Sequence, residues 1–240
     1  MPQSTGVQGL RGKGSVRRIL ELDGIIPQIP HYIARFTFSM ALKKLPYTKI
    51  GPLLKEYLSM QEDAETAALM PDLRQARVRR YLTPNELENV CRWKSARAIH
   101  HIKSNSASQI QKATRRALAT RSERQRLEAL MSLNGVSVPM ASAILTLLNP
   151  QRYGVIDIRV WQLLHAMGVV TKKSSGVGFN FNNWYQFLII IRHFAKTLGV
   201  DARDIERSLF LAHQAYQTDT LYQSPATSTL RKRPRLQTKR

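Results

Sequence analysis

The sequence predicts an all-α fold from three observations. Apolar residues recur at helical spacing on both sides of a central glycine, as at Leu127, Leu130 and Leu133. Helix-start signals are frequent along the chain. Prolines interrupt the apolar stretches between residues 19 and 58, which favours short helices over one long element. With 43% hydrophobic residues, 240 residues can supply a sizeable core.

Three regions follow from the pattern along the chain. Residues 1–18 combine glycine with basic residues and lack apolar periodicity, so we expect a flexible basic arm. Residues 19–216 carry the helical pattern and form the expected domain. Residues 217–240 lose the periodicity, and the last ten include six Lys or Arg and no acid, which predicts a disordered basic tail.

Predicted N-cap residues mark where the helices of the domain begin. Thr83-Pro-Asn-Glu86 combines a hydroxyl cap, proline in the first turn and glutamate three residues on, which predicts a helix start. Ser95, Ser106 and Ser122 are expected to begin further helices before residue 132. The apolar run of residues 184–198 predicts a buried helix, and Asp201 with Asp204 predicts the start of the last one.

A glycine hairpin stands at the centre of the chain, in Leu133-Asn-Gly-Val-Ser137. Gly135 allows a sharp reversal, Ser137 can cap the next helix, and Pro139 fits the first turn of that helix. A hairpin of this kind directs backbone N–H groups outward at a helix N-terminus. We therefore expect residues Asn134, Gly135, Val136 and Ser137 to bind phosphate through their backbone.

The charge predicts a polyanionic partner. Lys and Arg number 37 against 16 Asp and Glu, which gives a net charge of +21. Residues 92–126 carry +9, and we expect a DNA-backbone face there, although a solvated face is the alternative. The arginines proposed for DNA contact are Arg115, Arg116, Arg121 and Arg159.

The sequence disfavours several other classes of protein and of functional site. No apolar stretch has the roughly 18 residues that a membrane span needs, and no signal-peptide pattern is visible, so we expect an intracellular protein. The single cysteine, Cys91, excludes an intramolecular disulfide and a four-cysteine zinc or iron–sulfur site. No phosphate-binding GxxxxGK[ST], HExxH or zinc-deaminase cysteine pair occurs, and we expect neither metal nor cofactor.

Asp157 is the candidate catalytic residue. It lies 22 residues after Gly135, in Tyr153-Gly-Val-Ile-Asp-Ile-Arg-Val-Trp161, where an N-cap belongs. Leu133-x-Gly-Val-x-x-x-x-Ala141 together with this aspartate resembles the helix-hairpin-helix DNA glycosylase superfamily, over residues 122–168. The resemblance implies a two-lobed all-α fold with an active cleft between the lobes, and an essential aspartate at position 157.

Two departures from the family pattern matter. Ser137 stands where the family has its second hairpin glycine. Pro139 occupies the position of the lysine that attacks the sugar in bifunctional members, so the resemblance implies a monofunctional enzyme that uses water. Accordingly, we expect no lyase activity and no adduct trapped by borohydride.

As the catalytic residue, Asp157 would stabilise the positive charge that develops on the deoxyribose as the C1′–N bond breaks. A helix N-terminus favours the ionised carboxylate by roughly 0.3 to 1 kcal/mol. The base must leave the duplex to be reached, so a pocket needs flat or apolar walls. The candidates are Tyr153, Trp161, Trp93 and Lys94.

The expected function is base excision from double-stranded DNA by a monomer, which leaves an abasic site at a damaged or modified base. DNA repair is one role. Phage defence, by attack on hypermodified cytosines such as glucosylated hydroxymethylcytosine, is another. Alternatives are a non-enzymatic helix-hairpin-helix DNA-binding protein, in which Asp157 is only a cap, and a basic RNA-binding protein. The expected location is the bacterial cytoplasm at the nucleoid, and the basic tail leaves the nucleus open.

Overall fold

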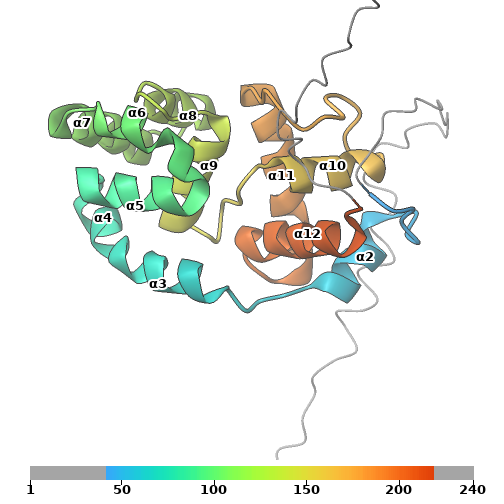
Figure 1. Ribbon diagram of the computed structural model, residues 1–240. Coiled ribbons are helices and arrows are strands. Elements are labelled where there is room, and N and C mark those ends of the chain that lie inside the picture. The colour runs from blue at the N-terminus through green and yellow to red at the C-terminus, as the bar shows by residue number, and fades with distance from the viewer. Residues whose placement is uncertain (1–41, 219–240) are drawn as a thin grey trace, which may run out of the picture.

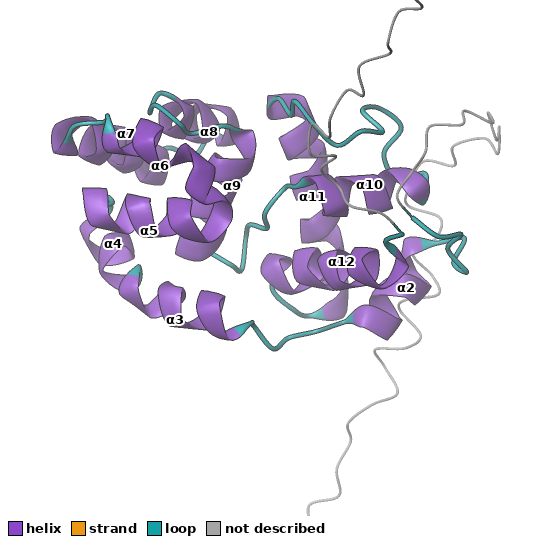
Figure 2. Ribbon diagram, in the orientation of Figure 1, coloured by secondary structure: helices purple, strands orange, loops and turns teal. Residues whose placement is uncertain are grey.

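The computed structural model describes residues 42–218, which form helices joined by loops, so the all-α prediction is confirmed for this part of the chain (Figure 2). The expected arm at residues 1–18 and the tail from residue 219 onward lie outside the described residues. An isolated antiparallel bridge joins Leu42 to Gln217. The helices are α2 (Ile50–Tyr57), α3 (Ala64–Asp72), α4 (Arg74–Arg79), α5 (Pro84–Ser95), η2 (Ala96–Ala98), α6 (Ile99–Lys103), α7 (Ala107–Ala119), α8 (Glu123–Met131), α9 (Val138–Leu148), α10 (Ile158–Ala166), α11 (Phe181–Leu198) and α12 (Ala202–Tyr216).

Most predicted helix starts are confirmed. Thr83 and Glu86 form a capping box at α5, with proline in its first turn. Ser106 and Ser122 accept hydrogen bonds from the backbone at the starts of α7 and α8. Ser95 was expected to cap a helix, but its side chain makes no cap hydrogen bond, because the chain continues directly from α5 into the 3₁₀ turn η2.

The helices form two groups in Figure 1. Helices α4 to α9 lie on the left, where α7 packs on α8 and α5 packs on α9. Helices α2, α10, α11 and α12 lie on the right, where the first three each pack on α12. The chain passes between the groups after α2 and again in the loop between α9 and α10.

The core runs through both groups. Trp161, Trp184 and Phe187 are its largest fully buried side chains, and α9 is buried along almost its whole length. Burial of such side chains from water stabilises the fold by about 1.5 to 3 kcal/mol each. The start of α9, directly after the hairpin, is therefore held by the core. Within residues 42–218, no helix has both the length and the apolar character needed to cross a membrane.

Candidate functional site

The hairpin between α8 and α9 has the predicted reversal at Gly135. Its φ is +80°, and a Cβ there would lie 2.9 Å from the Cβ of His101 and 3.2 Å from the backbone nitrogen of Ile102. L side chains rarely adopt this left-handed conformation, and α6 leaves no room for one. Glycine is therefore required at this position on two independent grounds.

Asn105 ties the hairpin to the end of α6. Its amide nitrogen donates to the carbonyl oxygens of Asn134 at 3.0 Å and Ile102 at 2.8 Å, and its carbonyl oxygen accepts from the Asn134 backbone N–H at 2.8 Å. The side chain is only 8% exposed. A buried amide that satisfies three backbone groups holds the hairpin in one conformation.

These bonds correct the expected phosphate donors. The N–H of Asn134 is used by Asn105, and the N–H of Val136 donates to the carbonyl of Leu133 at 3.2 Å, so neither is available to a phosphate. The N–H groups of Gly135 and Ser137 have no acceptor among residues 42–218. They remain the backbone donors of the hairpin.

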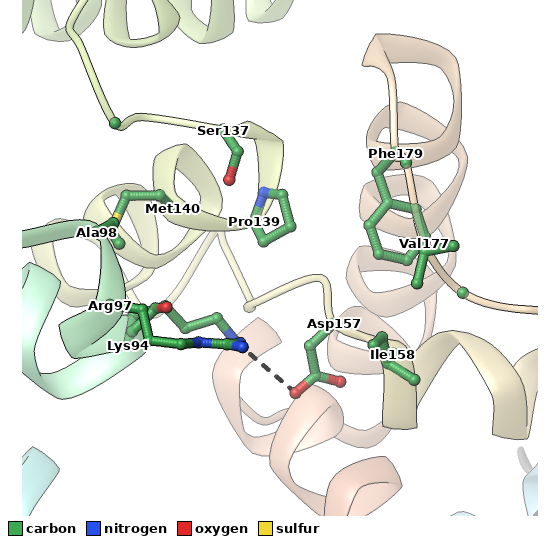
Figure 3. A pocket seen from close by; sticks show the side chains of 14 residues that line it. Lys94, Arg97, Ala98, Ser137, Pro139, Met140, Asp157, Ile158, Val177 and Phe179 are labelled. Atoms are coloured by element: carbon green, nitrogen blue, oxygen red, sulfur yellow. Dashed lines mark ion pairs between the residues drawn. The ribbon is translucent and has the colours of Figure 1, made fainter. Parts of the chain in front are cut away.

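Ser137 is the N-cap residue of α9, with extended backbone, and proline follows in the first turn as predicted. Its hydroxyl, however, makes no cap hydrogen bond, which corrects that part of the expectation. The hydroxyl instead lies at the wall of a pocket in front of the hairpin (Figure 3).

Asp157 is the N-cap of α10. Its Oδ1 accepts a hydrogen bond of 3.0 Å from the backbone N–H of Val160, while Oδ2 lies 3.7 Å from Nζ of Lys94. Both side chains are 19% exposed. One carboxylate oxygen thus caps the helix, and the other faces an ammonium group across the pocket, as Figure 3 shows. A cap and a second role are compatible in the same side chain.

Long-range bonds fix the segment that leads to Asp157. The Val155 N–H donates to Glu206 of α12 at 3.2 Å, and the Ile156 N–H donates to the Ser142 hydroxyl of α9 at 3.1 Å. At Gly154, a Cβ would come within 2.6 Å of the Glu206 Cβ, so the chain approaches α12 closely. Helices from both groups therefore set the position of the carboxylate.

Glu206 is itself buried and paired with Arg203. Burial raises the pKa of the Glu206 carboxyl above its ordinary value, and the nearby Arg203 guanidinium opposes this change. Arg203 also bonds Glu62, the residue before the cap of α3, at 2.9 Å. This network anchors α12 beneath the candidate site.

Two pockets meet at the Asp157–Lys94 pair. The first, here the hairpin pocket, has a volume of about 290 Å³ and lies between the end of α5, the hairpin, the start of α10 and residues 176–179. The second, the α12 pocket, has a volume of about 500 Å³ and is lined by α3, the end of α5, the start of α10 and α12. Lys94 and Asp157 line both, so a group bound in either pocket meets the ion pair.

Three further predicted residues lie at the α12 pocket. Trp93 lines it and donates from Nε1 to the Thr66 hydroxyl at 2.9 Å. Arg159 also lines it, with its guanidinium 5.1 Å from the Phe210 ring centre and a long bond of 3.4 Å to Gln217. Lys94 is the third of the predicted residues that line this pocket. The structure therefore brings Trp93, Lys94 and Arg159 together with Asp157.

Tyr153 and Trp161, both expected at the base pocket, line neither of these two pockets. Trp161 is fully buried and donates from Nε1 to the Lys173 carbonyl at 2.9 Å. Tyr153 is buried against Trp184, with ring centres 6.3 Å apart, and its hydroxyl bonds Glu123 at 3.0 Å. Both side chains are therefore part of the core.

Arg115, Arg116 and Arg121 are exposed on α7 and the turn after it. None of them lines either pocket, and Arg115 lies over the Tyr81 ring at 5.1 Å from its centre. Since α7 is at the outer left of Figure 1, the structure does not bring these cations to Asp157. Arg97, in the 3₁₀ turn η2 directly after α5, is the arginine that lines the hairpin pocket instead.

Sequence reasoning missed several residues of the site. Asn105, Ser142 and Glu206 act through contacts with segments distant in the sequence, and no local pattern marks them. No local pattern marks residues 176–179 as part of a site either, yet Val177, Gly178 and Phe179 line the hairpin pocket. Its Gly176 has a φ of +68° and passes Ile158 so closely that a Cβ would lie 3.1 Å from the Ile158 Cα.

The site offers no evident metal ligands. Among the described residues, no three His, Cys, Asp or Glu side chains gather as a metal site would require. The groups that could act chemically are the Asp157 carboxylate, the Lys94 amine, the Ser137 hydroxyl and the backbone N–H groups of the hairpin. No family model, curated protein or solved structure matches the chain.

Proposed function

We propose that the chain is a DNA glycosylase of the helix-hairpin-helix type. It would hydrolyse the N-glycosidic bond of a damaged or modified base extruded from double-stranded DNA. In this proposal the two groups of helices are the two lobes, and the pockets between them form the active cleft. The observation that carries it is the placement of Asp157 Oδ2 in a pocket that the hairpin also lines.

The chemistry follows from the two carboxylate oxygens. Breaking the C1′–N bond leaves positive charge on the sugar, which a fixed carboxylate at short range stabilises. Because Oδ1 is held by the Val160 N–H, the side chain is oriented before substrate arrives. Oδ2 can then face the sugar and the attacking water.

The hairpin supports a role in holding DNA. The N–H groups of Gly135 and Ser137 lie at the start of α9, and its helix dipole favours a phosphate there. Lys94 and Arg97 add positive charge to the same pocket. With a net charge of +21, the chain should bind duplex DNA with strong salt dependence.

Base release tests this function. The purified full chain is incubated with duplexes that contain oxidised, alkylated, deaminated or phage-modified bases, and alkali-labile sites are measured. We expect release from one of these classes, and loss of release in Asp157→Asn while DNA binding persists. Equal release by Asp157→Asn and the wild type would overturn the assignment of Asp157. The absence of release from every class would leave the DNA-binding alternative.

The non-enzymatic alternative has one observation in its favour, because Asp157 already has a structural task as the cap of α10. A DNA-binding protein of this kind would need the hairpin and the charge, and would use the carboxylate only as a cap. It predicts salt-sensitive binding of duplex DNA without base release.

A further inference from the structure

Helix α11 has an exposed face that lies outside both pockets. Tyr185 is 41% exposed and Ile189 is 54% exposed, although both side chains are large and hydrophobic. Phe181 precedes Tyr185 by four residues, so the three side chains lie along one side of the helix. Grouped exposed hydrophobic side chains are typical of an interaction surface, whereas single scattered ones are ordinary.

The aromatic rings on this face are stacked. The ring centres of Phe181 and Tyr185 are 5.4 Å apart, and their planes differ by 15°. The guanidinium carbon of Arg124, at the start of α8, lies 4.0 Å from the centre of the Phe181 ring. Parallel rings beside a guanidinium group offer a surface on which another flat π system stacks.

Positive charge borders these rings. Helix α11 has 18 residues and contains no Asp or Glu, and Arg192 and Lys196 continue the same side of the helix. The Glu123 carboxylate is shared by Arg126, Arg152 and Arg192, with N–O distances of 3.3, 3.1 and 2.8 Å. Three guanidinium groups on one carboxylate leave an excess of two positive charges. The surface is therefore complementary to a polyanion.

We propose that this face binds an unpaired stretch of DNA, and we call it the α11 platform. Bases would stack on the ring pair, and backbone phosphates would meet the cations beside it. The proposal adds a second DNA contact that base release does not require. It rests on the proposed function only for the choice of DNA as the nucleic acid. The platform consists of Arg124, Phe181, Tyr185, Ile189, Arg192 and Lys196.

The exposed rings favour an unpaired strand over a duplex. Within a duplex the faces of the bases are covered by their neighbours, so a protein ring on a helix surface cannot stack on them. In an unpaired strand each base offers a free π face, and stacking on aromatic side chains binds it with little regard to sequence. A duplex would use the cations of the platform but would have no use for Phe181 and Tyr185.

The α11 platform begins beside the hairpin pocket. Val177 and Phe179 line that pocket, and α11 starts two residues after Phe179 (Figure 3). Two residues of chain span roughly 7 Å at most. An unpaired strand that leaves the pocket along this segment therefore reaches the rings of Phe181 and Tyr185 directly, which is the reason for choosing DNA as the partner.

Photochemical crosslinking on the unaltered full chain tests the contact. An oligothymidylate strand that carries one 5-iododeoxyuridine is bound and irradiated, which joins the iodinated base to an aromatic ring stacked on it. Peptide mass spectrometry then locates the adduct. We expect it on Tyr185 or Phe181, and adducts confined to aromatic residues elsewhere in the chain would overturn the proposal. The strand contains no damaged base, so the result is independent of base release.

Two variants at one position separate stacking from hydrophobic contact. Tyr185→Phe keeps the ring, and Tyr185→Leu replaces it with a hydrophobic side chain that cannot stack. Fluorescence anisotropy with oligothymidylate should give a wild-type Kd for Tyr185→Phe and a Kd about 5- to 150-fold higher for Tyr185→Leu, which corresponds to roughly 1 to 3 kcal/mol of stacking per base. Equal thermal unfolding midpoints would confirm that both variants fold, as expected for an exposed side chain.

A fully paired duplex of the same length is the matched ligand control. Its Kd should be the same for Tyr185→Phe and Tyr185→Leu, because paired bases do not reach the ring. Equal affinity of the two variants for the single strand, or an equal loss for strand and duplex, would overturn the proposal. Tighter binding of oligouridylate than of oligodeoxyuridylate would overturn the choice of DNA.

A second copy of the chain is the other occupant that the experiments detect. A dimer in sedimentation equilibrium that Tyr185→Leu dissociates would assign the face to self-association and overturn the proposal. The two proposals of function fail separately. A missing adduct on the ring pair refutes the α11 platform alone, and missing base release from modified duplexes refutes the glycosylase alone.

Discussion

Asp157 caps α10 and, in the proposed function, also acts on the sugar, and a series of substitutions can tell these two tasks apart. Asn and Ser are about as good at an N-cap as Asp, so the change of cap alone should alter the free energy of unfolding of Asp157→Asn and Asp157→Ser by no more than about 0.5 kcal/mol. Asp157→Ala loses the bond from the Val160 N–H at 3.0 Å, which costs about 1 kcal/mol. The partly exposed pair with Lys94 adds no more than about 1 kcal/mol to any of the three.

Activity should follow a different order. Removing the charge that stabilises the transition state costs on the order of 10²-fold or more in rate in all three variants, or roughly 2.7 kcal/mol. Urea unfolding gives the stabilities, and single-turnover base release gives the rates. Activity that survives in Asn and Ser and falls only in Ala would mean that the carboxylate is merely a cap, and the catalytic reasoning would be refuted.

Three further predictions concern the hairpin and the core. Asn105→Ala leaves the Asn134 N–H without its partner at 2.8 Å, so urea unfolding should show a loss of about 1 to 3 kcal/mol; an unchanged midpoint would show that the amide does not hold the hairpin. Gly135→Ala must adopt a φ of +80° and meets the His101 Cβ at 2.9 Å, which should cost about 1 to 3 kcal/mol and weaken duplex binding in a salt titration; retained stability and affinity would argue against the close approach. His213 is fully buried, and burial lowers the pKa of its imidazole from 6.5 to about 4. Between these two values the unfolded chain binds more protons than the folded chain. The free energy of unfolding should therefore fall as the pH drops from 6.5 to about 4, by up to about 3 kcal/mol. His213→Leu should flatten this part of the stability profile, and an equally steep profile in the variant would assign the dependence to other groups.

The placement of aromatic residues shows where sequence reasoning reaches its limit. Trp93 and Trp161 each lie one to four residues from a charged residue of the site, and both were candidates for a base pocket. The structure puts Trp93 at the α12 pocket and buries Trp161 completely. The two tryptophans differ in whether their side of the helix faces a pocket or the core. That direction depends on the other helices that pack against each helix. Periodicity alone cannot supply that direction.

The sequence by itself determined the all-α class, the starts of α5, α7 and α8, the reversal at Gly135 and the cap at Asp157. These features depend on interactions between residues three or four apart or on the backbone freedom of a single glycine, so local patterns are sufficient to predict them.

Only the tertiary structure decided which groups meet. It placed the Lys94 amine 3.7 Å from Asp157, used the Asn134 N–H to fasten the hairpin to Asn105, and set Glu206 beneath the segment that leads to the carboxylate. Each of these contacts joins residues far apart in the chain. Their distances result from how whole helices pack around the common core, and no single stretch of sequence contains that information.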